Sequence, residues 1–153
     1  MTKDDLKAIM VEYGYDSNKT NSMIDAYKEI PAFTYMSVYN PKGVTPKPNC
    51  DFRSAFKDAY SEYGLYIFYD NNNKIIYVGE AAEEEFKDRL SQHFNESDGG
   101  LRNKLSLKPK LLSKLNASNV LILYGKYNKD DSRSTHFDED LLIGLFKPEL
   151  NDR

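Results

Sequence analysis

Two short apolar segments joined by four polar residues constrain the fold of this chain most strongly. Residues 64–69 and 74–79 are rich in aromatic and β-branched side chains, and Asp70-Asn71-Asn72-Asn73 lies between them. Because asparagine tolerates the positive φ of tight turns, this pattern predicts an antiparallel hairpin. A two-residue loop would place Tyr66 opposite Tyr77, with both phenols on one face of the sheet, whereas a three-residue loop would place them on opposite faces. Taken alone, the two tyrosines are an aromatic pair that stabilises the hairpin.

The rest of the chain predicts mostly helices, with one extended stretch at residues 33–39 and a third strand at residues 120–127. Helices are expected at residues 3–13, 20–30, 52–62, 83–94, 108–115 and 137–146. The sequence therefore predicts an α+β fold in which helices flank a small three-stranded antiparallel sheet. The proline-rich stretch 40–49 divides a mainly helical N-terminal extension (1–62), with a possible role in recognition or dimer contact, from a second domain (63–153).

The charge of the chain does not by itself favour a polyanionic partner. There are 21 lysines and arginines against 24 acidic residues, for a formal net charge of -3. Nucleic-acid binding would therefore need a local positive surface, and the segment from Arg102 to Lys114 is the candidate because it lacks acidic residues. The alternative is a solvated helix face. One cysteine and the lack of a long apolar run lead us to expect a soluble cytoplasmic protein without contact to a membrane.

The helix expected at residues 83–94 brings two polar side chains to one edge of its apolar stripe. Arg89 and His93 are four residues apart and therefore lie on one face. An arginine at such an edge can bind a phosphate through its fork of donors. The alternatives are a surface ion pair between Arg89 and Glu85, and a histidine satisfied at the boundary of the core.

The last predicted helix carries an acidic residue, Glu139, within its apolar arc. A carboxylate in such a position needs a partner, and a divalent cation is one. The alternative is that the acidic run 138–140 complements the N-terminus of the helix, with Thr135 as its cap and Asp138 as the capping-box partner. We expect this alternative for Asp138 and Asp140, and the cation for Glu139.

Taken in order, these residues resemble the GIY-YIG nuclease superfamily. The resemblance rests on Gly64-Leu65-Tyr66, Tyr77-Val78-Gly79, Arg89 with His93, and Glu139 followed by Lys147-Pro148 and Asn151, and it covers about the C-terminal ninety residues. A histidine one helical turn after the motif arginine, as His93 is here, resembles the restriction and phage branch of the superfamily. Two features depart from the family pattern: Glu80 stands where a lysine or arginine is common, and the interval from Gly79 to Arg89 is about two residues longer than usual.

The resemblance implies a DNA endonuclease with one Mg²⁺ or Mn²⁺ per active site, which leaves a 5′-phosphate and a 3′-hydroxyl. A phenol can accept a proton from water only if its pKa of about 10 is lowered by positive charge. The implied base is Tyr66 assisted by His93, and Tyr77 positions the water or exchanges roles with Tyr66. Arg89 would stabilise the transition state and Glu139 would hold the metal, while Asn151 orients neighbouring groups. The expected substrate contacts are Gly79, Lys87, Arg102, Lys104, Lys108 and Lys110.

Two other kinds of protein remain compatible with the sequence. One is a catalytically silent module of this fold that binds DNA or a protein, and the other is a structural protein with chance motif matches. A homodimer or higher oligomer is compatible with a nuclease, since a double-strand break needs two cuts.

Overall fold

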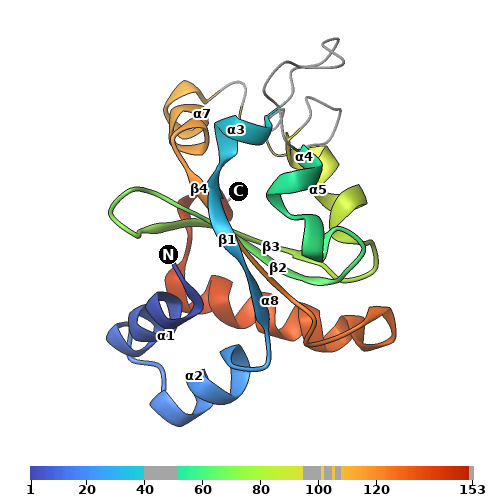
Figure 1. The fold of residues 1–153 in the computed structure, drawn as a ribbon. Helices are drawn as coiled ribbons and strands as arrows, with labels where there is room; N and C mark the ends of the chain where they lie inside the picture. The colour runs from blue at the N-terminus through green and yellow to red at the C-terminus, as the bar shows by residue number, and fades with distance from the viewer. Residues whose placement is uncertain (40–51, 95–100, 102–104, 106–107, 152–153) are drawn as a thin grey trace.

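A four-stranded antiparallel sheet lies at the centre of the protein (Figure 1). This computed structural model describes residues 1–39, 52–94, 101, 105 and 108–151. The strands are β1 (Lys28–Thr34), β2 (Gly64–Tyr69), β3 (Ile75–Ala81) and β4 (Asn119–Tyr124), in the order β1-β4-β2-β3. The predicted mixture of helices and an antiparallel sheet is confirmed, but the prediction of three strands is wrong. The fourth strand, β1, comes from the N-terminal segment and pairs with β4.

Strand β1 replaces part of a predicted helix. Helix α2 (Ser17–Ile24) ends earlier than its sequence pattern indicates, and the chain is extended from Lys28. Pairing with β4 offers the backbone of this segment hydrogen bonds that local propensity does not foresee. Pro31 has no amide proton, and it is tolerated because β1 is an edge strand whose register shifts between Ile30 and Phe33.

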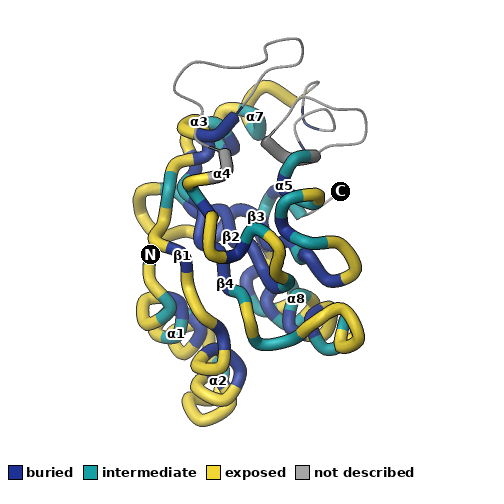
Figure 2. Tube along the Cα trace, turned by 45° about the vertical axis from the view of Figure 1, so that its right-hand side comes forward, coloured by how far each residue is buried: buried dark blue, intermediate teal, exposed yellow. Residues whose placement is uncertain are grey.

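Helices cover both faces of the sheet (Figure 1). On one face lie α1 (Lys3–Glu12), α2 and α8 (Ser132–Phe146); on the other lie α3 (Tyr35–Val38), α4 (Phe52–Ala55), α5 (Phe86–Phe94) and α7 (Pro109–Asn116). Short 3₁₀ turns occur at Lys57–Ala59, Lys129–Asp131 and Glu149–Asn151. Every residue of β2 is buried, as the dark strands in Figure 2 show. Among the described helices, none combines the length and apolar character that a membrane span requires.

The hairpin of β2 and β3 differs in register from the prediction. Tyr66 lies opposite Gly79, and Tyr77 lies opposite Phe68. The Asp70 amide donates to the Lys74 carbonyl at 2.9 Å, which makes a three-residue loop in place of the two-residue loop. A register shift between Phe68 and Tyr69 adds one more residue of offset, which returns the two tyrosines to the same face. Both tyrosines therefore do lie on one face, with ring centroids 6.1 Å apart, although they are diagonal neighbours and not a direct pair.

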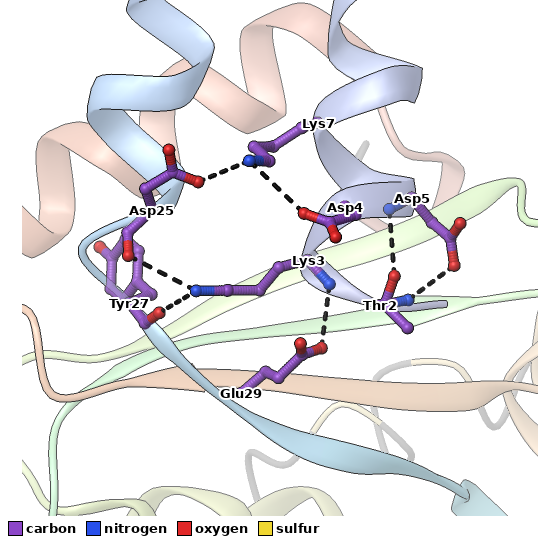
Figure 3. Close-up of polar contacts among 8 residues, drawn as sticks. All are labelled: Thr2, Lys3, Asp4, Asp5, Lys7, Asp25, Tyr27 and Glu29. Atoms are coloured by element: carbon purple, nitrogen blue, oxygen red, sulfur yellow. Dashed lines mark hydrogen bonds and ion pairs between the residues drawn. The ribbon is translucent and has the colours of Figure 1, made fainter.

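The first helix is attached to the start of β1 by polar contacts (Figure 3). Thr2 and Asp5 form a capping box that begins α1. The Lys3 ammonium donates to the carbonyl of Tyr27 at 2.7 Å, and the Lys3 amide donates to a carboxylate oxygen of Glu29 at 2.9 Å. These contacts bring α1 beside the strand that completes the sheet.

Asp138 has a different role from the predicted helix cap. Helix α8 begins at Ser132, ahead of the predicted Thr135 cap, and Asp138 is buried within the helix. Its Oδ2 accepts the Tyr27 hydroxyl at 2.7 Å and the Lys126 ammonium at 3.0 Å. The capping-box interpretation of Asp138 is therefore wrong, because the side chain connects α8 to the N-terminal segment.

Candidate active site

Two glycines set the close packing around the tyrosines of the hairpin. A Cβ atom on Gly79 would lie 2.3 Å from ring atoms of Tyr66, and one on Gly64 would lie 1.9 Å from the carbonyl oxygen of Leu123. Each position therefore excludes a side chain: Gly79 makes room for the phenol, and Gly64 lets β2 approach β4. Tyr66 is fully buried and Tyr77 is nearly so.

Arg89 connects α5 to the end of β3 and reaches the Tyr66 phenol. Its Nε donates to the backbone carbonyl of Glu80 at 3.3 Å, and its guanidinium lies within hydrogen-bonding reach of the Tyr66 hydroxyl. Burial raises the pKa of Tyr66 well above its usual value, and the positive charge of Arg89 offsets only part of this effect. Burial by itself would lower the pKa of Arg89, but the neighbouring phenols outweigh it and raise that pKa.

On the α8 side of β3, two carboxylates and an imidazole come together. Glu80 extends from β3, whereas His136 and Glu139 extend from one side of α8. The His136 Nδ1 lies 3.0 Å from a Glu80 oxygen and 3.8 Å from a Glu139 oxygen. The Glu139 side chain is only 14% exposed, and that of Glu80 is 22% exposed.

The charges of Glu80, His136 and Glu139 shift the pKa values of His136 and Glu139. Burial, and then the negative charge of Glu80, raise the pKa of Glu139 to about 7. The hydrogen bond to Glu80 is the main cause that raises the pKa of His136. Glu139 is therefore a carboxylate whose charge needs a cation for full stabilisation.

A cleft of about 490 Å³ opens beside this cluster. Its lining combines three carboxylates with two guanidiniums and an imidazole, contributed by Glu80, Glu83, Glu84, Arg89, Arg133 and His136. A phosphate would meet repulsion from the carboxylates in this cleft, so a bound cation would favour its entry.

Asn151 holds the edge strand from the C-terminal 3₁₀ turn. Its Oδ1 accepts the Val78 amide at 2.8 Å, and its Nδ2 donates to the Val78 carbonyl at 2.9 Å. Val78 is the central residue of Tyr77-Val78-Gly79 in the edge strand β3. The two bonds replace the backbone hydrogen bonds that a further strand would make with it.

The model of one protein family, described as the GIY-YIG catalytic domain, matches residues 62–148, which is more than half of the chain. The chain belongs to the GIY-YIG family. This family consists of endonucleases that act on DNA and generally use divalent metals, so a nuclease-type function follows for this chain in general terms. Among curated proteins and among solved structures, no protein matches the chain significantly.

Among the residues that the structure describes, the lysines predicted as substrate contacts of this GIY-YIG domain do not line the cleft. Lys87 forms an ion pair with Glu85 at 3.1 Å. Lys108 and Lys110 are exposed at the start of α7, and neither lines the cleft. Arg102 and Lys104 lie outside the described residues, as does the side chain of His93, whose backbone belongs to α5.

Sequence reasoning missed two members of the cluster. From the sequence, Glu80 is expected in the acidic first turn of a helix and as a departure from the GIY-YIG pattern, and no motif marks His136. The structure instead places Glu80 in β3. His136 lies three residues before Glu139, a spacing that places both on one side of a helix and could have identified it. No local signal brings Glu80 to them, because β3 and α8 are far apart in sequence.

Proposed function

We propose that the protein is a metal-dependent DNA endonuclease that hydrolyses a phosphodiester bond and leaves a 5′-phosphate and a 3′-hydroxyl. The observation that supports this proposal most directly is the electrostatic coupling among Tyr66, Arg89 and Glu139. They come from β2, α5 and α8, and the charges of Arg89 and Glu139 both act on the Tyr66 phenol. All three lie within the part of the chain that matches the family.

Arg89 is the group that would stabilise negative charge on the phosphate oxygens. Its Nε donates to the Glu80 carbonyl, and the residue lines the cleft. A planar, permanently charged fork is suited to phosphate, and a preorganised donor stabilises a transition state without reorganisation during the reaction.

Tyr66 remains our candidate for the group that takes the proton from water. The pKa condition that this role requires is not met in the resting site, because burial keeps the phenol protonated. Arg89 supplies positive charge, and a cation held by Glu139 would supply more. Tyr77 would position the water or exchange roles with Tyr66, and His93 would assist.

The residues at Glu139 fit a divalent cation. Oxygen donors suit Mg²⁺ and Mn²⁺, and the Glu139 carboxylate lies in a cluster with a second carboxylate and an imidazole. When bound, the cation would neutralise charge on the leaving 3′ oxygen. Asn151 supports this arrangement by holding β3 in place.

We expect the DNA backbone to contact residues beyond Tyr66, Arg89 and Glu139. Gly79 lies beside the Tyr66 ring, and the candidate contacts to the DNA backbone are Lys87, Arg102, Lys104, Lys108 and Lys110. Double-strand cleavage would require two such sites, so a homodimer is compatible with the proposal. The position of His93, which resembles the restriction and phage branch of the family, would be consistent with a role in restriction or in phage biology.

Plasmid cleavage with Mg²⁺ or Mn²⁺ tests the proposal. We expect Tyr66→Phe and Glu139→Gln each to reduce the rate by about 100-fold or more, and EDTA to abolish cleavage. The matched controls are Tyr13→Phe and Glu12→Gln, which change an exposed tyrosine and an exposed glutamate on the α1 side of the molecule. Binding of DNA without cleavage, across several substrates and both metals, would support the catalytically silent module instead.

A further inference from the structure

The cluster on α8 and β3 offers more metal ligands than the single carboxylate of the proposed function. We propose that Glu80 and His136 bind the divalent cation directly together with Glu139, and that this site selects Mn²⁺ or a similar transition-metal ion over Mg²⁺. The inference rests on the proposed function, because it concerns the metal of the same site.

The geometry of the three side chains suits one ion. One ligand atom from each residue can be chosen so that all three lie within 4.8 Å of one another. The shortest separation, from the His136 Nδ1 to a Glu80 oxygen, is 3.0 Å. Adjacent ligands of an octahedral ion with bonds of about 2.1 Å are about 3 Å apart. The His136 and Glu80 atoms already have this separation, whereas the Glu139 oxygen, 3.8 Å from the His136 Nδ1, would have to move closer.

One oxygen of Glu80 lacks a hydrogen-bond partner in the part of the chain that the structure describes. This atom, Oε2, is buried, whereas Oε1 faces His136. An unsatisfied buried acceptor is destabilising, so a carboxylate held there needs a further positive or donating group. A cation shared with Glu139 would also remove the repulsion between the two carboxylates.

The second nitrogen of His136 is placed as in a metal-binding histidine. Its Nε2 lies 3.3 Å from a carboxylate oxygen of Asp140 on the next turn of α8. Metal-bound imidazoles usually donate their other N–H to a carboxylate, which orients the ring and leaves the remaining nitrogen for the metal. Asp140 would therefore orient His136, while Nδ1 faces Glu80 and Glu139.

The ligand types decide which metal the site prefers. Mg²⁺ prefers oxygen ligands and retains several bound waters, so replacing one of these waters by an imidazole nitrogen is unfavourable. Two carboxylates and one imidazole suit Mn²⁺ and the later divalent ions better. The competing explanation is an ordinary ion pair between a protonated His136 and Glu80, which would exclude a cation from Nδ1.

Calorimetric titration of the full-length, EDTA-treated protein with MnCl₂ and with MgCl₂ separates these explanations. We expect wild-type protein to bind Mn²⁺ at least about tenfold more tightly than Mg²⁺, and Glu80→Gln and His136→Asn each to weaken Mn²⁺ binding about tenfold or more. Glu12→Gln, which changes an exposed glutamate on the α1 side of the molecule, is the matched control and should bind Mn²⁺ as wild type does. Circular dichroism would confirm that each variant is folded.

Pulsed electron paramagnetic resonance of bound Mn²⁺ gives a direct second measurement. We expect coupling to an imidazole nitrogen in wild type and in Glu12→Gln, and its loss in His136→Asn. If Glu80→Gln and His136→Asn bind Mn²⁺ like wild type while Glu139→Gln does not, the three-ligand site is wrong and the proposed nuclease function stands. If wild type binds neither ion and cuts no DNA with either, both proposals fail.

Discussion

Gly79 determines how the Tyr66 ring can lie against the edge strand. A Cβ at this position would approach the phenol to 2.3 Å, and Tyr66 has no free space because it is fully buried. We expect Gly79→Ala to displace the ring, reduce the free energy of unfolding by about 1–3 kcal/mol and abolish DNA cleavage. Urea denaturation and plasmid cleavage measure the two effects.

Gly144 provides the matched control for this substitution. It is exposed within α8, and nothing lies within 4 Å of a Cβ built there. Gly144→Ala should therefore raise stability by about 0.5–1 kcal/mol through helix propensity. A Gly79→Ala protein that is as stable and active as wild type would contradict the steric argument.

The carboxylate of Glu139 links stability to pH. Its pKa is about 7 in the folded protein, against 4.5 for an ordinary glutamate, so the folded state binds the proton more tightly. As pH rises from about 4.5 to about 7, the unfolded chain loses this proton first, and wild type loses stability at this site. In EDTA, Glu139→Gln should gain about 1–2 kcal/mol relative to wild type between pH 4.5 and pH 8, a figure reduced for partial solvent screening.

Urea denaturation of the two proteins across this pH range measures the difference. Added Mn²⁺ should reverse its sign near pH 8, because the cation stabilises wild type only. A difference in unfolding free energy that does not vary with pH would show that Glu139 is ionised throughout.

At the scale of elements, the C-terminal 3₁₀ turn supports β3 through a single side chain. Asn151 satisfies both the amide and the carbonyl of Val78. We expect Asn151→Ala to cost about 1–3 kcal/mol and to speed hydrogen exchange of the Val78 amide, because the edge strand loses both partners. Asn151→Asp keeps the acceptor and loses the donor, so it should protect the Val78 amide better than alanine does. Exchange at Val78 that is unchanged in Asn151→Ala would show that the turn does not hold the strand.

At the scale of the whole molecule, a buried polar cluster connects the N-terminal segment, β4 and α8. Asp138 accepts hydrogen bonds from Tyr27 and Lys126, and the Lys126 ammonium also donates to the Met23 carbonyl at 2.8 Å. Lys126 follows β4 in the chain, so three distant segments meet at one carboxylate. The N-terminal helices are thereby fixed to the same helix that carries Glu139.

Loss of the Lys126 ammonium from this cluster should destabilise the protein strongly. We expect Lys126→Met to cost about 3–5 kcal/mol at pH 8, because Asp138 is left buried without its positive partner. The double variant with Asp138→Asn should recover part of that loss, since the uncompensated charge is gone. Thermal and urea unfolding measure both, and additive effects of the two substitutions would contradict coupling between the residues.

The sequence alone determined the features that depend on neighbouring residues. The asparagine run predicts the hairpin, the four-residue spacing places Arg89 on the edge of α5, and the motif glycines stand where the backbone packs closely. The apolar setting of Glu139 likewise indicates a carboxylate in need of a partner. These inferences hold because turn preference and helical periodicity act over a few residues.

The tertiary structure decided the features that join distant segments. Pairing with β4 made β1 a strand against its local pattern, and a three-residue loop together with one register shift in the hairpin set Tyr66 opposite Gly79. Glu80 and His136 meet only because α8 packs against the end of β3. Such contacts follow from the packing of both faces of the sheet, which depends on the whole chain and is not encoded in any short stretch of residues.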